Sequence, residues 1–195
     1  MEPQREANRR LWDEWAPIHA RSELYELPQF RAGENKLNAL ERDELGAVAG
    51  KSLLHLMCHF GMDTLSWARL GASVTGVDFS AEAIRLAREL SAEVDVPGRF
   101  ICCDLYDLPQ QLDEAFDVVF TSYGVLSWLP DLEGWARIAA RYLKPGGVFY
   151  MAEIHPTSLL FADAVPEAEG EIAYDYFETR VLTLSENASY ADPAA

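Results

Sequence analysis

Apolar residues along the chain follow two different spacings. Near-continuous apolar runs predict buried strands over residues 52–57, 73–77, 99–103, 116–122 and 148–154. Between these runs, apolar residues recur at helical spacing and predict helices over about 63–70, 81–92 and 132–143. Strands that alternate with helices in this way are typical of a doubly wound α/β domain with a mostly parallel sheet, and the expected strand order is 3-2-1-4-5.

The segments on either side of this core are expected to be a cap and an extension. Leu11, Trp12 and Trp15 predict an amphipathic helix over 3–16 that Pro17 ends or bends, and a second helix is expected over 34–45. Residues 1–48 would then form a helical cap; a lid that closes over ligands is an equally good interpretation. After the core at 49–156, residues 157–195 form an extension, in which alternation over 172–178 and 180–186 predicts a β-hairpin.

Composition restricts the classes of binding partner and the cellular compartment that we expect. The 195 residues, of which 49% are hydrophobic, suit one domain. A formal charge of −16 repels nucleic acids and anionic membranes, no apolar run is long enough for a membrane span, and the polar start MEPQREANRR has no signal-peptide core. We therefore expect a cytoplasmic protein. Cys58, Cys102 and Cys103 are expected to be buried, reduced thiols without a disulfide or zinc site.

Residues 51–80 form the βαβ unit on which the functional interpretation depends. A dinucleotide-binding turn uses three glycines so that its backbone can approach a pyrophosphate, but Met57, His59 and Phe60 crowd this turn. Asp78 ends the second strand, where its carboxylate can accept hydrogen bonds from both ribose hydroxyls. The ligand that suits both features is an adenosine without phosphates, and S-adenosylmethionine is such a molecule.

The segment LLHLMCHFGMDTLSWARLGASVTGVDFS resembles the first motif of class I S-adenosylmethionine-dependent methyltransferases. The resemblance runs from about residue 8 to the end and implies a Rossmann-like sheet. In that family the sheet continues after the fifth strand with a helix and an antiparallel strand pair. We therefore expect a short or altered C-terminal end: either the extension replaces that pair, or the chain is shortened and leaves one sheet edge exposed. An exposed sheet edge suggests a homodimer. The chain departs from the general pattern at His55, which takes the acidic position, and at Met57 and His59, which take glycine positions.

The resemblance also implies which residues hold the cofactor. Asp104, with Leu105, is expected to bind the adenine, although Asp104 would also serve as a cap for a helix over 108–112. Ser122 and Tyr123 are expected near the sulfonium, while Trp128 either walls the acceptor site or packs a helix. The expected cofactor-binding residues are Met57, Cys58, His59, Phe60, Gly61, Asp78, Phe79, Asp104, Leu105, Ser122 and Tyr123.

Methyl transfer from a sulfonium is an in-line displacement, so it depends mainly on alignment in a dry pocket. His155, at the end of the fifth strand, is the candidate base if the acceptor must lose a proton, with Tyr123 as a second candidate catalytic residue. Alternatively, His155 only fixes the turn before Pro156. No metal site is expected. The predicted function is methyl transfer to oxygen, nitrogen or carbon of a small molecule. Cofactor binding without turnover is the alternative; a nicotinamide-dependent oxidoreductase is disfavoured by the crowded turn.

Overall fold

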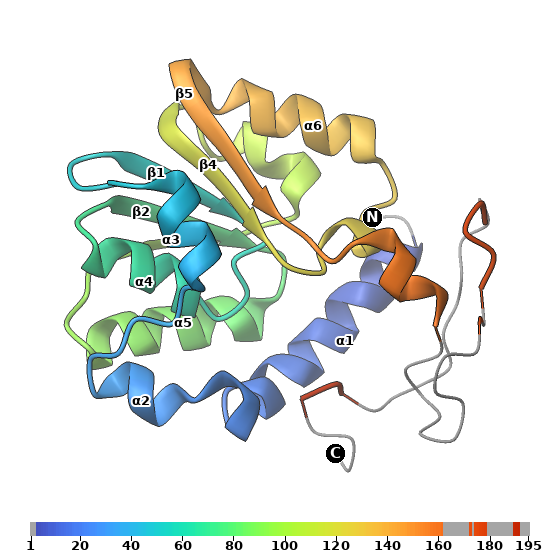
Figure 1. Ribbon diagram of the computed structural model, residues 1–195, viewed down its shortest axis with the longest axis horizontal. Helices are drawn as coiled ribbons and strands as arrows, with labels where there is room; N and C mark the ends of the chain where they lie inside the picture. The colour runs from blue at the N-terminus through green and yellow to red at the C-terminus, as the bar shows by residue number, and fades with distance from the viewer. Residues whose placement is uncertain (1–2, 162–171, 173, 179–188, 192–195) are drawn as a thin grey trace.

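The computed structural model describes residues 3–161, 172, 174–178 and 189–191. Its centre is a five-stranded parallel sheet in the order β3-β2-β1-β4-β5, as predicted (Figure 1). The strands are β1 Ser52–Leu56, β2 Ser73–Asp78, β3 Arg99–Cys102, β4 Phe116–Ser122 and β5 Leu143–Ala152. The carboxyl ends of parallel strands meet at one edge of a sheet, and this edge carries the predicted ligand site.

Two helical layers cover the sheet, because successive residues of each buried strand face opposite sides. Leu54 and Leu56 pack with the residues of α6 (Leu132–Arg141) and the 3-10 helix η2 (Leu105–Gln110). Leu53 faces the other side, where Trp67 of α4 (Met62–Arg69) joins its cluster and α5 (Ala81–Glu93) packs beside α4. The central strands are therefore apolar on both faces, as their near-continuous runs predicted.

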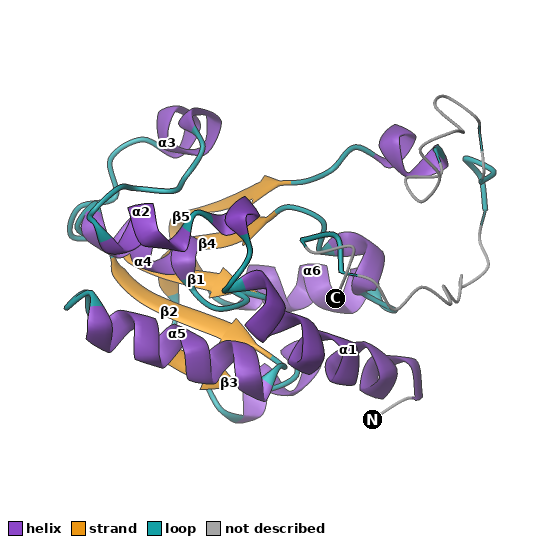
Figure 2. Ribbon diagram, turned by 90° about the horizontal axis from the view of Figure 1, so that it is seen from below, coloured by secondary structure: helices purple, strands orange, loops and turns teal. Residues whose placement is uncertain are grey.

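Helix α1 (Pro3–His19) lies beyond the carboxyl ends of the strands and packs against α5, as Figures 1 and 2 both show. It does not end at Pro17 as expected. Proline removes one helical hydrogen bond, but Ala20 N still donates to Ala16 O at 3.0 Å, and Trp15, Ala16 and His19 are buried. This packing outweighs the lost bond and extends the helix by one further turn.

The rest of the predicted cap differs in its boundaries. The expected helix over 34–45 is shorter, because Asn38 begins α3 (Ala39–Leu45) with a capping box to Glu41. A short helix, α2 (Leu27–Arg31), and a 3-10 turn, η1 (Glu23–Tyr25), precede it and were not predicted. Leu27 and Phe30 of α2 are buried, but the sequence around them is not periodic and gave no helical signal.

The C-terminal side is described only in part. Strand β5 starts at Leu143 rather than at 148, because Leu143 already pairs with Phe116 of β4, and the register then shifts so that Val148 pairs with Val118. After β5, the 3-10 helix η4 (Pro156–Leu160) leads to an isolated antiparallel bridge between Phe161 and Ile172. The expected first hairpin strand, at 172–178, contains a turn over Tyr176 and Phe177 instead. The second, at 180–186, lies outside the described residues. None of the described helices is long and apolar enough to cross a membrane.

Gly61 closes the turn after β1 and offers a direct test of packing at the sheet edge. Its φ is +77°, and an added Cβ would lie 2.6 Å from Phe100 Cε1 and 2.9 Å from Ala87 Cβ. We expect Gly61→Ala to lower the free energy of unfolding by about 2–4 kcal/mol, the sum of left-handed strain and overpacking. Gly50→Ala is the matched control, since Gly50 has the same φ of +77° but nothing within 4 Å. Equal losses in urea denaturation of the two variants would contradict this packing argument.

Candidate active site

Asp78 ends β2 at the carboxyl edge of the sheet, and its carboxylate is firmly held. Oδ2 accepts from the backbone N of His59 at 2.8 Å, and Oδ1 accepts from the backbone N of Ser80 at 2.9 Å. The residue is only 7% exposed, and burial raises its pKa to about 6 despite these hydrogen bonds. Each oxygen keeps a further lone pair, so a fixed, desolvated acceptor stands where the sequence predicted the ribose contact.

The turn between β1 and α4 keeps a left-handed backbone at positions where the family pattern has glycine. Met57 has a φ of +58° and His59 a φ of +52°, and Gly61 completes the turn at +77°. Two backbone hydrogen bonds hold the turn in place, from Cys58 N to Val77 O and from Gly61 N to Cys58 O, both at 2.9 Å. Left-handed conformations cost non-glycine residues about 1–2 kcal/mol each. These hydrogen bonds therefore hold the turn in a strained, left-handed conformation.

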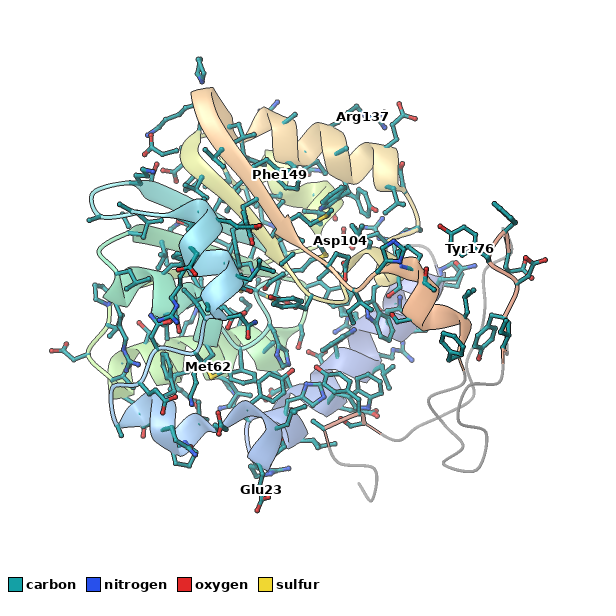
Figure 3. The ribbon with its side chains drawn as sticks, viewed as in Figure 1. Glu23, Met62, Asp104, Arg137, Phe149 and Tyr176 are labelled. Carbon is teal, nitrogen blue, oxygen red and sulfur yellow. The ribbon has the colours of Figure 1, made fainter. Side chains whose placement is uncertain are left out.

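Asp104 follows β3, and its carboxylate makes two contacts that bear on its predicted binding of the adenine. Oδ1 accepts from Tyr106 N at 2.9 Å, so Asp104 caps η2. Arg5 of α1 forms an ion pair with the same carboxylate, with Nε donating to Oδ2 at 2.9 Å. Figure 3 shows Asp104 where the start of α1 meets the sheet edge. Leu105 beside it is buried. An adenine amino group at Asp104 would therefore compete with the Arg5 guanidinium.

An aromatic cluster covers the turn after β1. Trp12 lies at its centre, with ring centroids 5.3 Å from His59 and 5.4 Å from Trp128. The cluster comes from α1, η1, the turn, the segment after β4 and the C-terminal segment. Its members are Trp12, Trp15, His19, Tyr25, His59, Trp128 and Tyr190. Trp128 thus packs against α1 rather than against the following helix alone. Helix α1 both packs on α5 and covers the predicted cofactor turn.

Two histidines meet inside this cluster. His19 Nδ1 lies 3.2 Å from His59 Nε2, and His19 Nε2 lies 2.8 Å from Ser189 Oγ. Burial lowers the pKa of both imidazoles, to about 4 for His19, so both are neutral at pH 7. The pairing of His19 with a residue 170 positions away had no sequence signal. His59 therefore contributes its backbone N to Asp78 and its ring to the cluster.

The end of β4 brings together polar groups that sequence reasoning had only partly connected. Ser122 Oγ donates to Asp63 Oδ2 at 3.2 Å and lies 3.5 Å from His55 Nε2. The Tyr123 hydroxyl accepts from Asn38 Nδ2 at 3.0 Å, and Tyr123 has a φ of +28°. Burial, followed by the charge of Glu41, raises the pKa of Asp63 to about 7. The sequence placed Asp63 at a helix start but gave no sign that Glu41 lies near it.

His155, the candidate base, lies just after β5 and is exposed. Its Nδ1 accepts from Thr157 N at 3.2 Å and so caps η4. Because a neutral imidazole that accepts at Nδ1 carries its proton on Nε2, His155 would have to release Thr157 before accepting a proton. The contacts therefore match the structural alternative, the fixing of the turn before Pro156.

Glu153 is a site-forming residue that sequence reasoning missed. Its carboxylate accepts from the backbone N of Val125 at 2.9 Å and of Leu126 at 3.0 Å, and it also bonds Gly124 N. These bonds join the end of β5 to the loop after β4 and fix the backbone that follows Tyr123. An acidic residue at a strand end was the available signal, two positions before the histidine that drew attention instead.

One expectation about the cysteines is wrong. Cys58 and Cys103 are buried, but Cys102 is exposed, since the sheet edge at β3 leaves it without cover. Met57 and Phe79 are half-buried, and Phe60 is buried. A hollow of about 270 Å³ lies away from Asp78, between the end of α1, α2 and α5. The contact between Asp78 and the aromatic cluster is the hydrogen bond from the backbone N of His59.

Comparison with known proteins agrees with this geometry. A family model described as a methyltransferase domain matches residues 54–151, half of the chain, from β1 through most of β5. The chain is 35% identical over 136 residues to a ubiquinone biosynthesis O-methyltransferase from Xanthomonas oryzae, which covers 68% of this chain and 56% of that protein. It is 31% identical over 158 residues to the human mitochondrial protein of that name, covering 77% of this chain and 42% of that one.

Solved structures give the same result for the fold. The PH0226 protein from Pyrococcus horikoshii superposes with a TM-score of 0.54 at 29% identity, over 62% of this chain and 56% of that one. The chain spans about half the length of the first curated relatives it matches. The matched segment contains the turn, Asp78, Asp104 and Ser122. The chain therefore belongs to the methyltransferase domain family.

Proposed function

We propose that this protein transfers a methyl group from S-adenosylmethionine to a small-molecule acceptor. The observation that carries the proposal is Asp78, a buried carboxylate fixed at the tip of β2 beside a strained, glycine-poor turn. The relatives are named O-methyltransferases, which favours an oxygen acceptor over nitrogen or carbon. Residues 49–156 would bind the cofactor, residues 1–48 would cover it, and 157–195 would form the extension.

The residues present fit an adenosine cofactor. Asp78 has free lone pairs for the ribose hydroxyls, and Asp104 can take the adenine amino group once Arg5 moves aside. When bound, the cofactor supplies an electrophilic methyl group on a positively charged sulfur. Ser122 and Tyr123, at the end of β4, would lie near the sulfonium, and the rings of Trp12 and Trp128 would exclude water from the acceptor.

Proton removal from the acceptor is the step with the least support. His155 and Tyr123 remain our proposed candidates, and His155 would first have to release Thr157. An acceptor that is already ionised needs no base at all. We therefore propose that alignment and desolvation supply most of the rate enhancement.

The proposed activity is tested with cofactor labelled in its methyl group. The purified protein is incubated with a panel of phenols, amines and carboxylic acids, and labelled product is separated from cofactor. We expect transfer to at least one oxygen acceptor, and much less transfer with Asp78→Ala when the cofactor is below saturation. Tight binding of S-adenosylmethionine without turnover on any acceptor would favour the alternative, a cofactor-binding protein that does not catalyse transfer. Binding of NAD instead would contradict both.

We also propose that the edge of the sheet pairs with a second subunit. Strand β5 is the last strand in the described sheet, and Val148, Phe149 and Met151 are 44%, 38% and 40% exposed. Apolar residues on an edge strand favour pairing with another strand. Light scattering after size-exclusion chromatography would measure the mass, and a monomer across the micromolar range would refute the homodimer.

A further inference from the structure

Asp13 of α1 joins this helix to the start of α5. Its Oδ1 accepts from the hydroxyl of Ser80 at 2.7 Å and from the backbone N of Glu82 at 3.2 Å. Ser80 is the N-cap of α5, since its Oγ accepts from Ala83 N at 3.0 Å. Asp13 therefore adds a second acceptor and a negative charge at the N-terminus of α5, where the helix dipole favours both.

Ser80 connects Asp13 to the proposed ribose site. Its backbone N donates to Asp78 Oδ1 at 2.9 Å, while its hydroxyl donates to Asp13. Ser80 is fully buried and Asp78 nearly so, which shields both hydrogen bonds from water and strengthens them. One buried residue thus separates the two aspartates, and a displacement of Asp13 would move the donor that fixes Asp78.

Arg9 holds the Asp13 carboxylate in this position. Arg9 Nη1 donates to Asp13 Oδ2 at 2.7 Å, one turn away on α1, and the same guanidinium binds Glu6. This ion pair leaves Oδ1 of Asp13 for Ser80, so both oxygens of the carboxylate are bonded. A side chain whose rotamer is fixed on both sides is suited to hold another residue in place.

The two anchors of α1 act on different parts of the proposed cofactor site. Arg5 pairs with Asp104, which is assigned to the adenine, and Asp13 reaches Ser80 beside the ribose. Arg5 and Asp13 lie about two turns apart, roughly 12 Å along the helix. The Arg5 side chain can therefore leave Asp104 for the adenine while Asp13 keeps its contacts.

Resting on the proposed function, we propose that Asp13 is a positioning residue for the ribose, because through Ser80 it fixes the carboxylate of Asp78. Helix α1 is then part of the cofactor site as well as its cover. Its contribution has two parts, a hydrogen bond that orders Ser80 and a negative charge close to Asp78. Burial and then this charge raise the pKa of Asp78 to about 6, so the two parts can be measured separately.

The hydrogen bond is tested by calorimetry of S-adenosylhomocysteine binding at pH 8. We expect Asp13→Ala to weaken binding about fivefold, less than a change at Asp78, because it loosens the ribose acceptor without removing it. Ser80→Ala should have a similar effect, and the double variant should lose little more than either single variant, since both break the same link. Glu6→Gln is the matched control and should keep its affinity, because Glu6 also binds Arg9 on α1 but bonds Arg10 rather than Ser80.

The charge is tested by the pH dependence of the same binding. Asp78 must be ionised to accept from two ribose hydroxyls, so affinity should fall as pH drops through its pKa. Asp13→Asn keeps an oxygen that can accept from Ser80 but removes the charge, so this fall should begin at lower pH than in the unaltered protein. Arg9 stays charged, and the other titratable groups near Asp78 stay neutral between pH 5 and 8, because burial lowers the pKa of His59 and raises the pKa values of Cys58, Cys102 and Cys103.

The outcomes separate this inference from the proposed function. Unchanged affinity in Asp13→Ala, an equal loss in Glu6→Gln, or fully additive losses in the double variant would overturn the positioning role and leave the cofactor assignment in place. An unshifted pH profile in Asp13→Asn would also overturn it, and this variant decides alone if Asp13→Ala shows no cooperative unfolding in urea. If the unaltered protein bound no S-adenosylhomocysteine at all, the proposed function would fail, and the role of Asp13 with it.

Discussion

Replacing Asp78 with alanine is expected to weaken S-adenosylmethionine binding by about 2–4 kcal/mol, a loss of roughly 30- to 1000-fold. The variant would lose the two hydrogen bonds that we propose from the ribose hydroxyls to this charged, buried acceptor. It also frees the backbone N of His59 and of Ser80, which Asp78 now accepts, so the turn beneath the ribose loses its anchor. Isothermal titration calorimetry measures the loss directly, and affinity within threefold of the unaltered protein would remove Asp78 from the site.

A second aspartate provides the control for general damage to the sheet. Asp117 is the second residue of β4, at the opposite, amino-terminal edge of the sheet, and accepts from Ser52 N at 2.8 Å and from Ser52 Oγ at 2.7 Å. Asp117→Ala should therefore lower stability without changing the affinity of the folded protein. Asp78→Asn adds a graded step, because its single amide oxygen retains part of the acceptor function. We expect an affinity between those of Asp78→Ala and the unaltered protein.

The strands could be predicted from sequence because the pattern and the environment agree. A strand buried on both faces needs a continuous apolar run, and β4 shows one with the bounds that were predicted. Asp78 was found for a related reason: a charged residue at the end of such a run must lie at the sheet edge. By contrast, Glu41 and Asp63 meet through the packing of α3, and pairs brought together by tertiary contacts leave no local pattern.

The turn after β1 shows how sequence and backbone can diverge. Met57 and His59 replace glycines of the family pattern, and their side chains were expected to crowd the turn. The backbone instead remains left-handed at both positions. Hydrogen bonds to Asp78 and Val77 stabilise that conformation from outside the turn. Local propensity therefore fails here because the surrounding sheet determines the conformation.

Replacing Asp63 with asparagine is expected to stabilise the ligand-free protein at pH 8 by roughly 1–3 kcal/mol. Burial and the Glu41 charge raise the pKa of Asp63 from 3.8 to about 7. For an acid with a raised pKa, the folded state is favoured below the unfolded value and loses stability as pH rises through the folded value. The full shift corresponds to about 4 kcal/mol, which the partial solvent access of Asp63 reduces.

The advantage of the variant should therefore disappear as pH falls from 8 to 4, because a protonated aspartic acid and asparagine are both neutral. Three titratable groups around Asp63 keep their charge between pH 4 and 8: His55 is neutral throughout this range, and Tyr25 and Tyr123 stay neutral because their pKa values are raised. Glu41 also has a raised pKa, so Glu41→Gln should reduce the gain from Asp63→Asn in the double variant. Urea denaturation of Asp63→Asn, Glu41→Gln and the double variant at pH 4, 6 and 8 measures these changes in stability. A gain that is constant with pH would show that Asp63 is ionised without cost.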